Sequence, residues 1–153
     1  MSTREIKAKQ ITEAIAALCI SANINADKSI RHAICQARIT EISEPAKNAL
    51  DMIIENMKVA ETERMPMCQD TGMVVVFADI GQEVYIKGNL TDAINQGVRQ
   101  GYKEGYLRAS VVADPINRKN TGDNTPAVIH YNIVPGDQVK ITVIFMLSPS
   151  TIL

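Results

Sequence analysis

The stretch Met73-Val74-Val75-Val76-Phe77-Ala78 decides how this chain can fold, since it is the most apolar strand-like run of the sequence. It is too short for a helix, and it is too apolar for an edge that faces solvent. The run therefore predicts a central strand of a sheet. Gly81-Gln82 separates it from Val84-Tyr85-Ile86-Lys87, which predicts a second strand that returns beside the first as a hairpin.

Three helices are expected before this strand. Apolar residues recur at helical spacing from about Ile6 to Cys19, and a second, shorter helix is expected from about Asp27 to Arg38. In the third helix Ser43 is placed as the N-cap. An apolar stripe at i, i+3, i+4 and i+7 in this helix is expected to be buried, and it consists of Leu50, Ile53, Ile54 and Met57.

A fourth helix is expected after the second strand, starting near Thr91 or Asp92. Gly97, Gly101 and Gly105 follow one another at intervals of four residues in it. Glycine inside a helix costs ~1 kcal/mol relative to alanine. The glycine stripe therefore predicts that another backbone packs closely against this helix.

The remaining part of the chain predicts a loop and two more strands. Residues 117–126 contain no large apolar side chain, which indicates a long surface loop. Alternating apolar residues on either side of Pro135-Gly136-Asp137 predict a C-terminal hairpin. The resulting fold class is α+β, in which N-terminal helices are followed by a mixed or antiparallel sheet with one inserted helix.

The composition excludes several classes of protein. The chain has 153 residues, with 16 Lys and Arg against 17 Asp and Glu, so nothing favours nucleic acid or an anionic membrane as partner. No apolar run approaches the ~20 residues that span a bilayer. Three cysteines without a Cys-x-x-Cys spacing fit a reducing compartment, and we expect a cytoplasmic, single-domain protein.

The segment 65–72, which leads into the apolar strand, is the first candidate for chemistry. If its backbone is extended, Cys68 and Asp70 project to the same face and Gln69 to the other. A thiolate is a soft ligand suited to iron-sulfur clusters, and a carboxyl beside it can transfer a proton. Two alternatives are a buried cysteine next to a simple turn, and a nucleophilic cysteine, which needs His32 or His130 nearby.

Two further segments are candidates. Arg108, just after Gly105, has the geometry to bind a carboxylate, although an arginine at this place also suits the helix dipole. The polar loop 119–126 has the glycine and asparagine residues of a backbone nest for an anion, but it lacks the P-loop pattern. Cys19 and Cys35 lie in helical stretches and are expected to be core residues.

Together these segments resemble one family, the class I (iron-sulfur) fumarate hydratases, and in particular the alpha subunit of the two-subunit form. The tartrate dehydratase alpha subunit is a more distant match. The resemblance covers the chain from about Ile6 to Val143. It is carried by Met-Pro-Met-Cys-Gln-Asp-Thr-Gly at 65–72, Leu-Arg-Ala-Ser-Val-Val-Ala-Asp-Pro at 107–115 and Lys-Asn-Thr-Gly-Asp-Asn-Thr-Pro-Ala at 119–127.

The resemblance implies a hydro-lyase that interconverts fumarate and L-malate at a 4Fe-4S cluster. On this basis Cys68 matches a cluster ligand. Gln69 and Asp70 match residues that contact the substrate, with Asp70 as the proton donor to the departing hydroxyl, and Arg108 matches a contact to a substrate carboxylate. The family also implies an oligomer and a beta subunit that supplies the catalytic base.

The chain departs from the family after Val143. In the family this strand continues into a longer stretch that carries the other two cluster cysteines, whereas residues 144–153 form an apolar tail. We therefore expect an N-terminal portion of an alpha subunit over 1–143 and an aberrant tail caused by truncation or a frameshift. Such a chain is expected to be inactive alone. A tartrate dehydratase and a non-catalytic dicarboxylate-binding module without a cluster are the alternatives.

Overall fold

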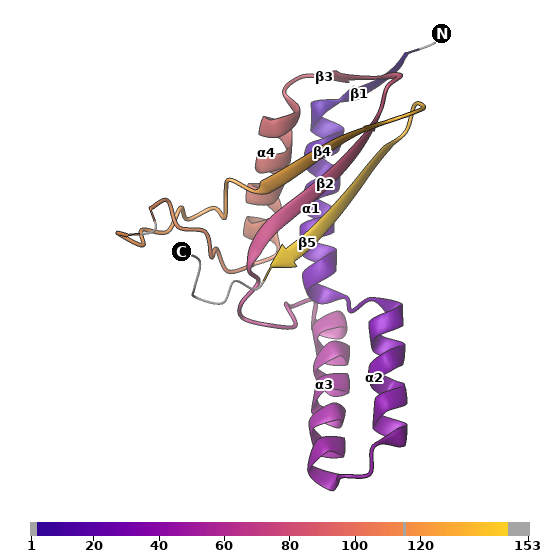
Figure 1. Ribbon diagram of the computed structural model, residues 1–153. Coiled ribbons are helices and arrows are strands. Elements are labelled where there is room, and N and C mark those ends of the chain that lie inside the picture. The colour runs from indigo at the N-terminus through magenta and orange to yellow at the C-terminus, as the bar shows by residue number, and fades with distance from the viewer. Residues whose placement is uncertain (1–2, 115, 147–153) are drawn as a thin grey trace.

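Two helices cover one face of a three-stranded sheet in the computed structural model, which describes residues 3–114 and 116–146 (Figure 1). This arrangement of helices and mixed sheets confirms the predicted α+β class. The elements in chain order are β1 (Arg4–Lys7), α1 (Ala8–Ile24), α2 (Lys28–Thr40), α3 (Glu44–Glu63), β2 (Met73–Gly81), β3 (Val84–Lys87), α4 (Leu90–Glu104), β4 (Val128–Val134) and β5 (Val139–Met146).

Strand β2 is the central strand, as its sequence predicts. The order of the sheet is β4-β2-β5, with β2 parallel to β4 and antiparallel to β5. Both predicted hairpins are wrong. β3 pairs in parallel with β1, and β5 pairs with β2 instead of β4. Because β4 and β5 occupy both hydrogen-bonding edges of β2, no edge is left for β3.

The connection between β4 and β5 passes over the end of β2 and does not close a tight turn. The Gly81 amide donates to the Gln138 carbonyl at 2.8 Å, and the Glu83 amide donates to the Gly136 carbonyl at 3.0 Å. A methyl group on Gly81 would lie 2.2 Å from the Gly136 carbonyl oxygen. Only glycine therefore allows the backbones to approach this closely.

The helices largely follow the predicted pattern, and the differences have a structural reason. The chain forms strand β1 before α1, which the helical spacing did not predict. In α3, Ser43 is the N-cap, but only Met57 of the expected buried stripe has less than a tenth of its surface exposed, and Ile53 is 44% exposed. The reason is that α2 and α3 pack on each other as a hairpin that extends away from the sheet (Figure 1).

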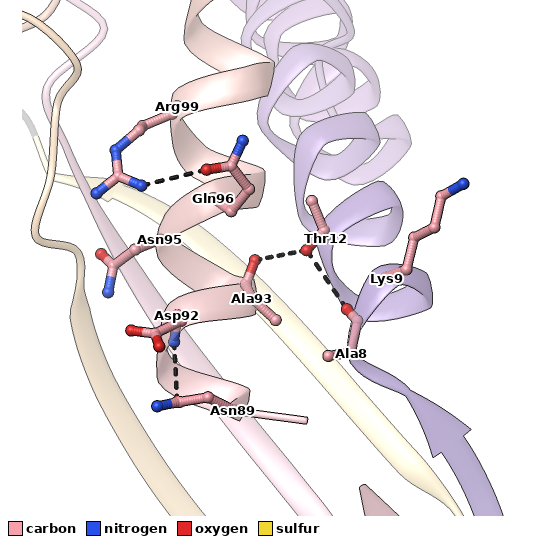
Figure 2. A pocket seen from close by; sticks show the side chains of 9 residues that line it. All are labelled: Ala8, Lys9, Thr12, Asn89, Asp92, Ala93, Asn95, Gln96 and Arg99. Atoms are coloured by element: carbon pink, nitrogen blue, oxygen red, sulfur yellow. Dashed lines mark hydrogen bonds between the residues drawn. The ribbon is translucent and has the colours of Figure 1, made fainter. Parts of the chain in front are cut away.

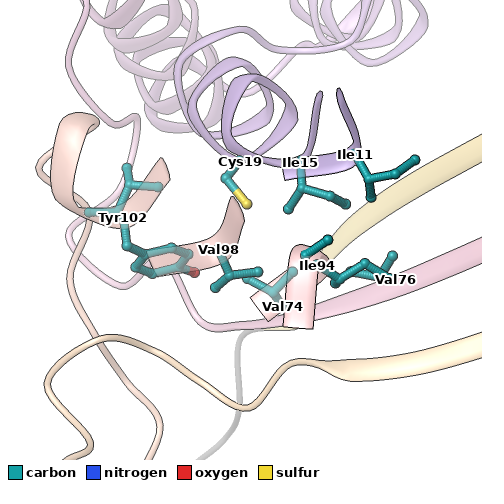
Figure 3. Packing of buried hydrophobic residues seen from close by; sticks show 10 residues of the cluster. Ile11, Ile15, Cys19, Val74, Val76, Ile94, Val98 and Tyr102 are labelled. Atoms are coloured by element: carbon teal, nitrogen blue, oxygen red, sulfur yellow. The ribbon is translucent and has the colours of Figure 1, made fainter. Parts of the chain in front are cut away.

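The core lies between α1, α4 and the sheet (Figure 3). The glycine stripe predicted close packing, and this is confirmed. A methyl group at Gly97 would lie 2.6 Å from Ile15 Cβ and 2.6 Å from the Thr12 carbonyl oxygen. The labelled residues of the core are Ile11, Ile15, Cys19, Val74, Val76, Ile94, Val98 and Tyr102.

The expected boundary after Val143 falls inside a strand. β5 continues to Met146, which pairs with Met73 at the start of β2. Residues 147–153 of the expected tail lie outside the described part of the chain. Among the helices of residues 3–114 and 116–146, none has the length and apolar character needed to cross a membrane.

Candidate functional site

The first two candidate segments meet at one cavity, beside the start of β2. The cavity has a volume of about 490 Å³ and is open to solvent. It brings together two segments whose lining residues are at least 35 positions apart in the chain, because α4 packs against β2 before the second segment begins. The cavity is lined by Met65, Pro66, Cys68, Gln69, Thr71, Tyr106 and Arg108.

The segment 65–72 is bent at residues 67–69 and not extended. The bend is held by α1 and α3, since the Met67 amide donates to the Asn23 carbonyl and Asn56 Nδ2 donates to the Met67 carbonyl, both at 2.9 Å. Cys68 and Gln69 consequently both line the cavity. The condition for placing Cys68 and Asp70 on one face with Gln69 on the other, an extended backbone, is therefore not met.

Asp70 is not among the residues that line the cavity, although its neighbours Gln69 and Thr71 are, and its carboxylate contacts the second segment. Its Oδ1 accepts hydrogen bonds from the Gly72 amide and from the Ser110 hydroxyl, both at 3.3 Å. The same hydroxyl lies 3.4 Å from the Arg108 carbonyl oxygen. The carboxylate is therefore held in place by two donors, one from each segment.

Buried polar groups tie the start of β2 to the end of α4. The Tyr102 hydroxyl lies 3.2 Å from the Thr71 carbonyl and 3.0 Å from the Gly72 carbonyl, to which it donates. Burial raises the pKa of Tyr102 well above its ordinary value, so this hydroxyl remains a donor at any physiological pH. The Thr71 hydroxyl donates to the Arg108 carbonyl at 2.9 Å.

Arg108 reaches the cavity because the chain reverses direction after α4. Tyr106 adopts a left-handed conformation with φ 52°, and the Leu107 amide then donates to the Tyr102 carbonyl at 2.9 Å. Leu107 is buried in the core, whereas Tyr106 and Arg108 are exposed and line the cavity. The turn thus brings one positive charge to the cavity that holds Cys68.

The third segment does not line the cavity, and its description as a surface loop needs a correction. Asn124 has no exposed surface and Thr125 is 7% exposed. Asn124 Oδ1 accepts from the amides of Ser110 at 2.7 Å and Val111 at 3.1 Å, and its Nδ2 donates to the Gly72 carbonyl at 3.2 Å. The polar composition of this loop predicts that its side chains are exposed. Asn124 is buried because its side-chain amide serves as the hydrogen-bond partner of three backbone groups.

The loop does not present the backbone nest that its glycine and asparagine residues suggest. The Gly122 amide donates to Asn120 Oδ1 at 2.6 Å, and the Thr125 amide donates to Asp123 Oδ1 at 3.0 Å. Burial raises the pKa of Asp123, but hydrogen bonds from Thr125 and Arg99 outweigh it and hold the pKa below its usual value. The carboxylate therefore remains a charged acceptor within the loop.

The three cysteines lie in three different environments. Cys19 is fully buried between α1 and α4 (Figure 3), where burial raises the pKa of its thiol to about 12. Cys35 is half-buried on α2, and Cys68 is exposed at the cavity.

The two histidines do not line this cavity. His32 is on the exposed surface of α2, and His130 stacks on Phe77 with ring centroids 4.9 Å apart. The placement therefore does not support a nucleophilic cysteine activated by histidine.

An iron-sulfur cluster needs more ligands than Cys68 alone. Such clusters are normally held by several cysteine thiolates. Across residues 3–114 and 116–146, no group of three or more His, Cys, Asp or Glu residues lies close enough together to hold a metal ion. These residues therefore do not fit a four-iron cluster by themselves. They provide one accessible thiol, that of Cys68, at the candidate site.

The burial of Cys19 gives a direct prediction for thiol reactivity. A pKa of about 12 in place of 9.0 lowers the thiolate fraction of Cys19 about a thousandfold, and burial also blocks access. With excess iodoacetamide at pH 8, mass spectrometry should show Cys68 modified first and Cys19 modified only after denaturant is added. Rapid modification of Cys19 in the folded protein would contradict its place in the core.

A second cavity, of about 530 Å³, lies between the first halves of α1 and α4 (Figure 2). Its polar groups bind one another. Thr12 Oγ1 donates to the Ala93 carbonyl at 3.0 Å, and Arg99 donates to Gln96 Oε1 at 3.2 Å and to Asp123 Oδ2 at 2.7 Å. Two of its lining residues, Arg99 and Asn95, connect α4 to the loop 119–127 through their hydrogen bonds to Asp123 and Ala127.

Most of the chain is similar in sequence to known proteins. A family model described as Fumarate hydratase (Fumerase) matches residues 12–146. A protein of Methanocaldococcus jannaschii with the provisional name L(+)-tartrate dehydratase subunit alpha is 34% identical over 125 residues, which are 78% of this chain and 44% of the relative. The L(+)-tartrate dehydratase subunit alpha of Escherichia coli is 28% identical over 146 residues, which are 93% of this chain and 48% of the relative.

A third relative is named as a fumarate hydratase, and its name mentions no subunit. The anaerobic class I fumarate hydratase of Escherichia coli is 34% identical over 102 residues, which are 65% of this chain and 19% of that protein. The chain therefore spans less than half of the length of each of these relatives.

Proposed function

Because the chain belongs to the fumarate hydratase family, we propose that it is part of a hydro-lyase that adds water to a small dicarboxylic acid and removes it again. The observation that carries this proposal is the cavity in which Cys68, Gln69 and Arg108 meet. Their segments come from distant parts of the sequence, and both lie within residues 12–146, which match the family. We place this enzyme in the cytoplasm, on the basis of the reducing compartment that its cysteines favour.

Arg108 is proposed to bind one carboxylate of the substrate. Its guanidinium is always charged and carries paired donors whose spacing suits the two oxygens of a carboxylate. Gln69 lines the same cavity and offers both an amide donor and an acceptor oxygen to the bound acid. Together they fix the position of a dianion at the surface of the chain.

Asp70 is proposed to hold the proton that leaves with the hydroxyl group. The Ser110 hydroxyl and the Gly72 amide both donate to the same carboxylate oxygen, Oδ1. Its other oxygen, Oδ2, is the atom proposed to carry and release the proton. A general acid has to be held in this way, within hydrogen-bond reach of the group that it protonates.

Cys68 is proposed to supply one ligand of a 4Fe-4S cluster in the assembled enzyme. The described residues do not complete such a cluster, so the proposal places its other ligands outside residues 3–114 and 116–146. It follows that residues 1–143 act as an N-terminal portion of an alpha subunit and need further protein for activity. Two relatives are named as alpha subunits, which supports an oligomer that contains a beta subunit.

The substrate is tested by binding of small acids to the chain. The amide NMR signals of residues 68–72 and 106–111 are followed while fumarate, L-malate, L-tartrate or the monocarboxylate crotonate is added. We expect a dicarboxylate to shift these signals at concentrations at least about tenfold lower than crotonate needs, since a second carboxylate can accept a hydrogen bond from Gln69 while the first binds Arg108. Preference for tartrate would identify a tartrate dehydratase, and equal binding of crotonate would contradict the proposal.

The role of Cys68 is tested in a chimera that already contains the rest of a cluster site. The matched segment of the anaerobic Escherichia coli class I fumarate hydratase is replaced by the corresponding residues of this chain. After anaerobic reconstitution we expect broad visible absorption and hydration of fumarate. Both should be lost on Cys68→Ala and kept on Cys35→Ala, the matched control. A folded chimera that keeps its colour without the Cys68 thiol would contradict the assignment and favour the non-catalytic module.

A further inference from the structure

Asn124 is the one residue of the loop 119–127 whose side chain contacts both segments of the candidate site. Its carbonyl oxygen accepts from the amides of Ser110 and Val111, and its amino group donates to the Gly72 carbonyl. The side chain thus makes three hydrogen bonds, all to the backbone of residues two or three positions after Asp70 or Arg108.

The surroundings of Asn124 make these bonds strong and hard to replace. The side chain has no exposed surface, so its hydrogen bonds are shielded from solvent in the folded chain. The backbone of Asn124 is left-handed, with φ 59°, a conformation that asparagine and glycine tolerate better than most residues. Its position is fixed from the other side of the loop, where Asn95 Oδ1 accepts from the Ala127 amide at 2.9 Å.

The bonds of Asn124 bear directly on the contact between the two segments. The residue that donates its amide to Asn124, Ser110, also donates its hydroxyl to Asp70 Oδ1. The residue whose carbonyl accepts from Asn124, Gly72, donates its own amide to the same carboxylate oxygen. The two groups that donate to Asp70 therefore belong to Ser110 and Gly72, and the side chain of Asn124 links the backbones of these two residues.

We propose that Asn124 is a positioning residue, which holds the Ser110 hydroxyl and the Gly72 amide on the Asp70 carboxylate and keeps Arg108 at the same cavity. The inference rests on the proposed function, because Asp70 and Arg108 act on a bound dicarboxylate. Ser110 is the direct contact, and Asn124 acts through it. This gives the third family-like segment a role although it does not line the cavity.

Two variants separate positioning from simple stabilisation. Asn124→Gly keeps the left-handed backbone and deletes the three hydrogen bonds. Asn95→Ala is the matched control. It deletes a side chain that also ties the loop to the fold, through bonds to the Ala127 amide and the Thr91 carbonyl, but it does not reach the two site segments.

The first measurement is amide hydrogen exchange, which does not depend on a ligand. In Asn124→Gly the amides of Ser110 and Val111 should exchange at least about tenfold faster, because each loses a buried acceptor. In Asn95→Ala these two amides should exchange at nearly the wild-type rate. Unchanged exchange at Ser110 and Val111 in Asn124→Gly would overturn the inference, whether or not the chain binds an acid.

The second measurement is the affinity for fumarate, with folding checked by circular dichroism. Asn124→Gly should weaken binding about tenfold, and Asn95→Ala should leave it within about twofold, even where the two variants lose similar stability. Ser110→Ala should weaken binding as well, and Ser110→Thr should restore it, since threonine returns the hydroxyl. Equal losses of affinity in Asn124→Gly and Asn95→Ala would overturn positioning and leave a structural role. A wild-type chain that binds none of fumarate, L-malate and L-tartrate would instead overturn the proposed function.

Discussion

Replacing Gly97 with leucine is expected to remove a large part of the stability of this fold. A single methyl group at this position would lie 2.6 Å from Ile15 Cβ and 2.6 Å from the Thr12 carbonyl oxygen. Neither atom is the end of a flexible side chain, so helices α1 and α4 have to separate. Overpacking a core costs typically 1–3 kcal/mol, and for the four added carbon atoms we expect about 3 kcal/mol or more.

The stability expected to be lost on replacing Gly97 exceeds the gain in helix propensity and is a large share of the total stability of a domain. The gain in helix propensity on replacing glycine is only ~1 kcal/mol, and domains have about 5–15 kcal/mol of total stability. Gly97→Ala should therefore also be destabilising, although less so than leucine. Urea unfolding followed by circular dichroism measures both effects.

The control for Gly97 is Lys103→Leu, which adds a leucine to the exposed face of the same helix. It should change the free energy of unfolding by less than about 0.5 kcal/mol. If Gly97→Leu unfolds at the same urea concentration as this control, the close approach of α1 and α4 is not present in solution.

Replacing Arg108 with alanine is expected to weaken binding of a dicarboxylate by about 10- to 100-fold. A hydrogen bond to a charged group contributes roughly 1.5–3 kcal/mol, and Arg108 is the one positively charged residue that lines the described cavity. Arg108→Lys should recover only part of the affinity, because lysine keeps the charge but not the paired donors. Isothermal titration calorimetry with fumarate measures these changes.

The control for Arg108 is Lys103→Ala, which removes one positive charge near the same end of α4 without touching the cavity. Its effect on affinity should be small and should disappear at high salt. Equal weakening by both variants would mean that fumarate responds to the net charge of the surface and not to a contact with Arg108.

Part of the candidate site could be predicted from sequence. The pattern of residues 65–72 identified Cys68, the resemblance to a known family added Gln69, and the position of Arg108 after a helix marked it as a possible carboxylate contact. The structure brings these three to one cavity. It also shows what the pattern missed: Asp70 faces Ser110, and Asn124 is buried. The first contact depends on the bend at residues 67–69, and the second on the hydrogen bonds of the Asn124 side chain to backbone groups. Neither feature produces a periodic pattern of apolar residues in the sequence.

The sequence by itself determined the four helices and all strands except β1, because side-chain spacing repeats every 3.6 residues in a helix and every two in a strand. The glycine spacing in α4 also predicted a close helix neighbour. Only the tertiary structure decided the strand order β4-β2-β5 and the pairing of β1 with β3. Backbone hydrogen bonds are the same for every residue type, so the choice of neighbour depends on how the whole chain packs.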